Sequence, residues 1–135
     1  GFARVCGFGG GFGRAMLNGW GEPAIKHFVQ EAIDQAMRLE RALARLETEK
    51  RVVLLHYAPI RDTVVGENPE IMPFLGSSRF EGPLNRFNVS VAFHGHAHAG
   101  APEGKTGTGV PVYNVALPVL RKADAGAKGY RVVEV

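Results

Sequence analysis

A cluster of alternating histidines directly after a short apolar segment constrains this chain more than any other feature. Residues 89–93 read Val-Ser-Val-Ala-Phe, a run typical of a buried strand. Residues 94–100 read His-Gly-His-Ala-His-Ala-Gly and hold three of the five histidines of the chain. Ligands of open α/β sheets bind beyond the carboxyl ends of the strands, so this pattern predicts a functional site at a strand end.

A second histidine stands in the same kind of position. Residues 51–55, Arg-Val-Val-Leu-Leu, form the most strand-like segment, and their continuous apolar character favours a central strand. This segment ends in His56, and Pro59 stops it shortly afterwards. Neighbouring parallel strands place their carboxyl ends side by side, so we expect His56 to lie near the cluster at 94–100.

The spacing of the cluster leaves three alternatives open. In an extended segment His94, His96 and His98 would share one face. A break at Gly95 would instead separate two of them and let them bind two different ions. Neutral imidazole suits borderline divalent metals such as Zn, Fe, Mn or Ni. A surface cluster with accidental metal affinity is the third alternative, because short motifs also match by chance.

The remaining patterns predict an α/β fold with one long covering helix. Pro23 opens an amphipathic stripe that runs to about Thr48, roughly 39 Å of helix, with His27 between its two faces. Further expected elements are strands at 1–6, 110–116 and 130–135, a helix at 79–86 capped by Ser77 or Ser78, an exposed loop at 101–109 and a polar turn at 121–129.

A glycine-rich segment follows the first expected strand. Residues 7–13 read Gly-Phe-Gly-Gly-Gly-Phe-Gly, which favours a flexible connection or lid anchored by Phe8 and Phe12. A phosphate cradle is the alternative, although the Gly-Lys-Ser/Thr ending of a P-loop is missing. Arg14 then either pairs with an anionic group or is an ordinary surface arginine.

Composition narrows the class of protein. The 135 residues, with 45% hydrophobic and 21% charged side chains, fit one domain spanning residues 1–135. No apolar run approaches the roughly 20 residues of a membrane span, and no signal peptide is evident. The net charge of +3 is spread along the chain, so nucleic acid is not indicated as a partner.

The single cysteine and the first residue lead to two further expectations. Cys6 excludes an intrachain disulfide, fits a reducing compartment such as the cytoplasm, and is expected to be a small buried hydrophobe. The sequence starts at Gly1, inside an expected strand, so we expect it to begin partway through a longer protein.

The pairing of a strand that ends in His56 with a strand that leads into Gly-His-x-His at 95–98 resembles the C-terminal half of the calcineurin-like metallophosphoesterases. The likeness covers most of residues 51–120. It implies part of an αββα sandwich, with a mixed sheet and the metals at the strand ends. It also implies that His56 and His96 hold the second metal and His98 the first.

Three other residues near the expected strand ends have no such assignment. His94 precedes the matched motif and is expected to be structural or to support the metal ligands. Asn114 and Tyr57 would contact ligands or substrate, or belong to the core. No residue is assigned a catalytic role.

The resemblance is incomplete in a way that matters chemically. The Asp-x-His, Gly-Asp-x-x-Asp and Gly-Asn-His-Asp/Glu motifs of the family are missing, and with them the bridging aspartate. Few aspartates remain: Asp34 falls in the expected helix, and Asp62 and Asp124 fall in loops. Two cations about 3.5–4 Å apart need a shared anionic ligand. We therefore expect this chain alone to bind at most one ion, weakly, and to be inactive without an N-terminal half or another chain.

The resemblance implies a hydrolase, which in the complete protein cleaves phosphate mono- or diesters with metal-activated water. The alternative is a non-catalytic binding or assembly module, because half a sandwich exposes an apolar sheet face and unpaired edges. Another copy of the chain is then an expected partner. A mononuclear metal protein using His56, His96 and His98 with an open coordination position is a third reading.

Overall fold

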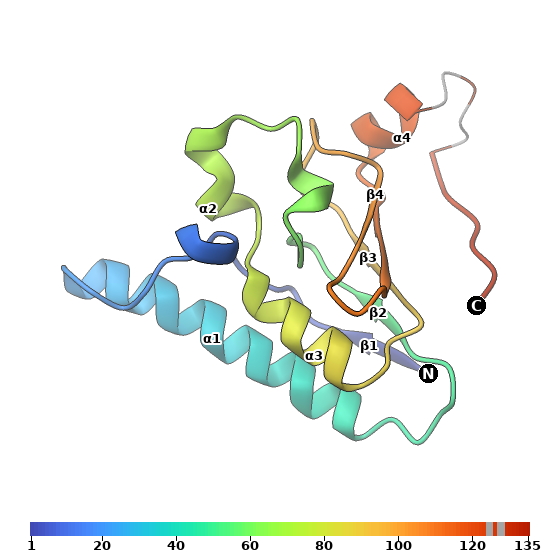
Figure 1. Ribbon diagram of the computed structural model, residues 1–135, viewed down its shortest axis with the longest axis horizontal. Coiled ribbons are helices and arrows are strands. Elements are labelled where there is room, and N and C mark those ends of the chain that lie inside the picture. Colours follow the sequence, from blue (N-terminus) through green and yellow to red (C-terminus); the bar gives the residue numbers. More distant parts are fainter. Residues whose placement is uncertain (124–125, 127–128) are drawn as a thin grey trace.

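The computed structural model describes residues 1–123, 126 and 129–135, and its centre is a five-stranded sheet (Figure 1). The strands are β1 (Phe2–Arg4), β2 (Val52–Leu54), β3 (Val91–His94), β4 (Glu103–Lys105) and β5 (Pro111–Asn114). Their order is β1-β2-β3-β5-β4, with the first four parallel and β4 antiparallel to β5. The prediction of a mixed sheet in an α/β fold is confirmed.

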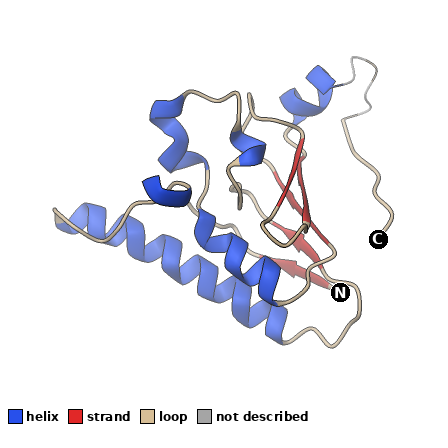
Figure 2. Cartoon of the chain, viewed as in Figure 1, coloured by secondary structure: helices blue, strands red, loops and turns tan. Residues whose placement is uncertain are grey.

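Helices gather mainly on one side of this sheet (Figure 2). The α-helices are α1 (Pro23–Ala44), α2 (Met72–Leu75), α3 (Glu81–Arg86) and α4 (Leu117–Ala123). Short 3₁₀ turns occur at Gly13–Ala15, Asp62–Val64, Pro69–Ile71 and Ser78–Phe80. No helix in the part of the chain that the structure describes is long and apolar enough to cross a bilayer.

The covered face of the sheet is a row of small and β-branched side chains. Ala3, Val53, Ala92 and Val112 are partners across four adjacent strands, and each is at most 2% exposed. Leu39 and Leu43 of α1 and Leu84 of α3 belong to the same buried cluster. This apolar contact fixes α1 and α3 against the sheet.

The long helix α1 begins where the sequence predicts but ends four residues earlier, at Ala44 rather than Thr48. Beyond its end, the Arg51 guanidinium donates to the carbonyls of Leu46 (3.2 Å) and Phe87 (2.7 Å). Phe87 follows the last residue of α3. One arginine therefore satisfies carbonyl groups that follow both helices, as side chains near helix C-termini commonly do.

The opposite face of the sheet is only partly covered. Residues 129–135 contact it through side chains: the Arg131 guanidinium lies 3.9 Å from the centre of the Tyr113 ring and bonds Glu103 at 2.7 Å. The prediction of a strand at 130–135 is wrong, because this segment contacts the sheet without joining its hydrogen-bonding ladder. Over β1 and β2, Phe2 is 73% and Leu54 38% exposed.

Other sequence predictions are corrected or refined. The expected loop at 101–109 contains the edge strand β4, and the expected turn at 121–129 begins inside α4. Residues 124, 125, 127 and 128, and with them Asp124, lie outside the described residues. The helix at 79–86 is confirmed as a 3₁₀ turn followed by α3, and the Ser77 hydroxyl accepts from the amide of Arg79 at 3.3 Å.

The glycine-rich segment is packed rather than lid-like, so that prediction is wrong. The amides of Gly10, Gly11 and Gly13 donate to the Pro73 carbonyl (2.6 Å), the Gly76 carbonyl (2.9 Å) and the Ser78 hydroxyl (3.0 Å). These donors are occupied inside the protein, which also removes them from a phosphate cradle. Phe12 is buried and anchors the segment as expected, with Phe8 partly buried.

Two side chains near the beginning of the chain, those of Cys6 and Arg14, are exposed. Cys6 is exposed, because it follows the edge strand β1 on its uncovered side, so the prediction of a buried cysteine is wrong. Arg14 is exposed, as an ordinary surface arginine would be.

We expect Gly76→Ala to destabilise the fold by about 3 kcal/mol. A Cβ at position 76 would overlap the backbone carbonyl of Ala58, where the segment before α3 pairs with the chain after β2. Gly82→Ala is the matched control, because its Cβ meets nothing within 4 Å and it lies in α3. Urea unfolding should show Gly82→Ala more stable than the wild type by about 0.5–1 kcal/mol. Equal stability of the two variants would contradict this packing argument.

Candidate functional site

Backbone pairing beyond the strand ends brings the histidines together. The amide of Leu55 donates to the Phe93 carbonyl (2.8 Å), and the amide of Gly95 donates to the His56 carbonyl (3.2 Å). Parallel pairing of β2 with β3 thus continues until His56 lies directly beside Gly95. The expectation that His56 lies near the histidine cluster is confirmed.

The imidazoles of His56 and His96 form a contact pair. Their ring centres are 4.7 Å apart, and the Tyr57 ring lies 4.6 Å from that of His96 and 5.1 Å from that of His56. His98 is exposed, and it lies close enough to His56 to affect its protonation electrostatically. Two separate segments therefore bring His56 and His96 into contact, with the exposed His98 nearby.

The backbone turns sharply at His96. This residue has a φ of +63°, and the amide of Ala97 donates to the Gly95 carbonyl at 2.7 Å. An i to i+2 hydrogen bond around a residue with positive φ is a γ-turn, which is uncommon and strained in a residue with a side chain. Because of this turn the three alternating histidines do not share a face. His94 is buried, whereas His96 and His98 lie beyond the break at Gly95.

The hydrogen bond of His96 fixes which ring nitrogen carries the proton. Its Nε2 lies 3.1 Å from the Phe74 carbonyl oxygen, which can only accept, so Nε2–H donates and Nδ1 keeps its lone pair. Metal-bound histidines usually donate their other ring N–H to a carbonyl or carboxylate in this way. The Nδ1 of His96 is therefore the nitrogen that could bind a ligand.

The surroundings of His56 favour the neutral form of its ring. Partial desolvation, followed by the neighbouring His96 and His98, lowers the pKa of His56 below its usual value of 6.5. Near pH 7 its ring therefore carries a lone pair, which is the form that binds metals.

His94 has a different role. It is fully buried, its Nδ1–H donates to the Gly95 carbonyl (2.8 Å), and its Nε2 accepts from the Thr63 hydroxyl (2.7 Å). Both ring nitrogens are used inside the protein, so His94 cannot bind a ligand without breaking these bonds. Burial lowers the pKa of His94 to about 4. Its role is structural, one of the two expected from the sequence.

Asn114 supports the same turn from β5. It is fully buried, and its side-chain amide donates to the carbonyls of Ala97 (2.7 Å) and Thr63 (3.3 Å). Its side-chain oxygen accepts from the amide of Ala116 at 3.1 Å. Asn114 is thus a core residue that holds the backbone next to His96, while Tyr57 lies directly against the histidine rings.

Sequence reasoning missed three participants. Thr63 binds His94, the Phe74 carbonyl binds His96, and the Glu67 carboxylate accepts from the amide of Ala99 at 2.7 Å. All three come from residues 60–88, where the sequence has no regular pattern. Each acts across at least 22 residues of sequence separation, so no local motif signals it.

A cavity of about 550 Å³ opens beside His56 at the carboxyl ends of β1 and β2. Arg4, Cys6, Leu54 and Gly95 are among its lining residues. Leu54 lies on the partly covered sheet face, where it is 38% exposed and also borders a second cavity with Tyr130 and Arg131. The histidine pair therefore borders open space on the uncovered side of the sheet.

His56 and His96 fit the imidazole part of a metal site, but they are not a complete set of metal ligands. A metal–nitrogen bond of about 2.1 Å puts a ring centre about 3 Å from the ion, so two rings on one ion have centres about 4.5–5.5 Å apart. The spacing of His56 and His96 falls in this range. Among residues 1–123, 126 and 129–135, however, no three His, Cys, Asp or Glu side chains form a group that could hold a metal. The described part of the chain thus supplies no complete ligand set.

Comparisons with known proteins do not add to this picture. No protein-family model, curated protein or solved structure matches the chain.

We expect acid to destabilise the fold through His94. Its pKa is near 6.5 in the unfolded chain and about 4 in the folded one, so between these values the unfolded chain binds more protons. The stabilisation is complete above pH 6.5 and is lost as the pH falls toward 4, by on the order of 3 kcal/mol. Urea unfolding at several pH values measures this slope.

His94→Gln is the control, since it removes the titrating group and keeps a hydrogen-bonding side chain. Its unfolding free energy should be lower at pH 7 and flatter between pH 6.5 and 4. If the variant does not fold, an NMR titration of the wild type replaces it. A His94 ring that takes up a proton near pH 6.5 would contradict the prediction.

Proposed function

We propose that this chain supplies the imidazole ligands of a metal-dependent phosphoesterase of the calcineurin-like type. In the complete protein His56 and His96 would hold one metal and His98 the other. The observation that carries the proposal is the contact between His56 and His96, whose ring centres lie 4.7 Å apart at the carboxyl ends of adjacent parallel strands. Ligands of open α/β sheets bind at this position, beyond the carboxyl ends of the strands.

The local structure supports a ligand role for His96. His96 lies in a strained γ-turn. Its hydrogen bond to the Phe74 carbonyl leaves the lone pair of the ring on Nδ1. Strained backbone of this kind persists where the surroundings enforce it, and it is concentrated at functional sites. Here Asn114 enforces it by holding the Ala97 carbonyl.

The proposed site also needs anionic ligands that the described residues do not supply. Bound metals in such a site polarise a phosphate ester and supply a hydroxide nucleophile. Neutral imidazoles cannot offset the repulsion between two close cations, and no carboxylate joins them in a metal-binding group among the described residues. The missing carboxylates would come from an N-terminal half or another chain, placed in the cavity beside His56 on the uncovered side of the sheet.

Metal binding by the purified chain tests the ligand assignment. We expect at most one equivalent of Mn²⁺ or Zn²⁺ to bind weakly, and His96→Ala to weaken binding at least about tenfold, because it removes a ligand. His27→Ala is the control, since His27 lies exposed on α1. Calorimetric titration of the three proteins measures the difference. Equal affinity for wild type and His96→Ala would overturn the assignment.

Activity tests the incompleteness of the site. The chain alone with added Mn²⁺ should not hydrolyse a chromogenic phosphodiester above the rate of the metal in buffer. Coding sequence upstream of Gly1 should contain Asp-x-His and Gly-Asn-His. Rapid turnover by the chain alone, abolished in His96→Ala, would favour the mononuclear alternative and contradict this proposal.

A second candidate function, a non-catalytic assembly module, is favoured by one specific observation. Phe2 and Leu54 expose large apolar side chains on the same side of the sheet, next to the open edge of β1. Unpaired edges and exposed apolar faces drive association between chains.

The second function is tested by measuring whether the chain associates with itself. We expect the wild type to associate in sedimentation velocity experiments, and Phe2→Ser with Leu54→Glu to remain monomeric, because the apolar face is then interrupted. Met37→Gln is the matched control, an exposed apolar residue on α1. A monomeric wild type at high concentration would argue against an assembly role for this chain alone.

A further inference from the structure

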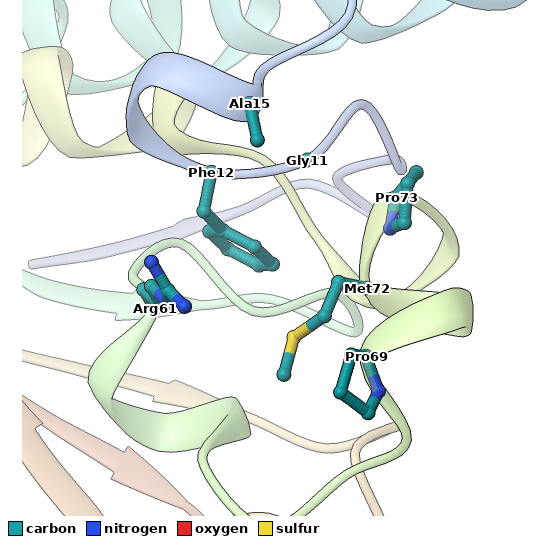
Figure 3. A pocket seen from close by; sticks show the side chains of 7 residues that line it. All are labelled: Gly11, Phe12, Ala15, Arg61, Pro69, Met72 and Pro73. Carbon is teal, nitrogen blue, oxygen red and sulfur yellow. The ribbon is translucent and has the colours of Figure 1, made fainter.

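A pocket separate from the histidines lies between the glycine-rich segment and α2 (Figure 3). It measures about 230 Å³, and its lining residues include Phe12, Ala15, Arg61, Pro69, Met72 and Pro73. None of the histidines lines it. The wall is mainly apolar, and Figure 3 shows Phe12, Met72 and Arg61 grouped around the space.

The pocket is built from buried parts of the fold. Phe12 is buried in a cluster with Ala58, Val64 and Leu75, and Met72 packs against that cluster. The Gly11 backbone is tied on both sides, its amide to Gly76 (2.9 Å) and its carbonyl to the amide of Ser78 (3.1 Å). The glycine-rich segment is therefore a fixed wall, and a ligand need not order it.

Among the residues that the structure describes, Arg61 is the one charged residue that lines the pocket. Its guanidinium has no hydrogen bond and no ion pair with any part of the chain that the structure describes. An unpaired cation beside an apolar wall is complementary to a molecule with one anionic group on an apolar body.

We propose that this pocket binds a small aromatic carboxylate, with the ring against Phe12 and Met72 and the carboxylate on Arg61. The size fits, because a cavity of about 150 Å³ already accommodates benzene. A single planar guanidinium matches a carboxylate by two parallel hydrogen bonds. A phosphate dianion would leave more charge uncompensated, since no second cation from the described part of the chain lines the pocket.

This inference is independent of the proposed metal site. The glycine-rich segment, which does not serve as a phosphate cradle, here serves as one wall of a ligand pocket. The pocket needs neither metal nor the missing half of the protein, so its test does not depend on either.

Chemical shifts of the ¹⁵N-labelled chain during titration with benzoate test the proposal. We expect saturable shifts centred on Gly11, Phe12, Arg61 and Met72, and much weaker binding of benzamide, the uncharged analogue. Arg61→Gln should weaken benzoate binding about tenfold, the effect of losing a charge-assisted hydrogen-bond pair. Arg121→Gln, at an exposed position on α4, should leave binding unchanged.

Three results would overturn the proposal. Shifts centred on Phe2 and Leu54 would place benzoate on the uncovered sheet face. Equal binding of benzamide, or unchanged benzoate binding in Arg61→Gln, would show that Arg61 does not select the anion. Arg61 is exposed, so the variant is expected to fold, and its own spectrum verifies this.

Discussion

The parallel pairing of β2 with β3 is the constraint on which the candidate site depends. Leu54 is the partner of Phe93, and the hydrogen bonds continue past both strands until the His56 carbonyl receives the Gly95 amide. This register alone sets the distance between His56 and the turn at His96. A slip by one residue would reverse the faces of a strand and bury the wrong side chains. The covered row from Ala3 to Val112 prevents that slip, so the core packing also fixes the site.

A buried polar network then sets the direction of the imidazoles. His94 binds the Gly95 carbonyl and Asn114 binds the Ala97 carbonyl, so the γ-turn at His96 lies between two anchored residues. Both side chains also bind Thr63. Buried polar groups are costly unless they are fully hydrogen-bonded, and each of these side chains has its partners. His94, which stands at the end of its strand, is the histidine of the cluster that cannot serve as a ligand, in agreement with the structural role expected from the sequence. Both of its ring nitrogens already form hydrogen bonds inside the protein, and one of these bonds holds the turn.

The sequence predicted what depends on local periodicity. Strands at β1, β2, β3 and β5, the start of α1 and the capped helix at α3 follow from apolar patterns and from Pro23 and Ser77. It also predicted that His56 would approach the cluster, since that follows from parallel pairing. It failed where long-range contacts decide. The segment 130–135 has strand composition but pairs with neither edge of the sheet, and its Arg131 binds Tyr113 and Glu103 instead. Thr63, Phe74 and Glu67 contribute to the site through contacts that no local pattern reveals.

Several exposed features of the described chain lie on the same side of the sheet. Phe2 and Leu54 are exposed there, Cys6 follows the open strand β1, and the space beside His56 opens in the same direction. Two metal ions in the proposed site would need a shared anionic ligand, and the exposed apolar side chains would be stabilised by an apolar cover. One additional layer of protein on this side would meet both needs. The assembly and catalytic interpretations therefore describe the same surface, and they differ in whether the covering layer carries carboxylates.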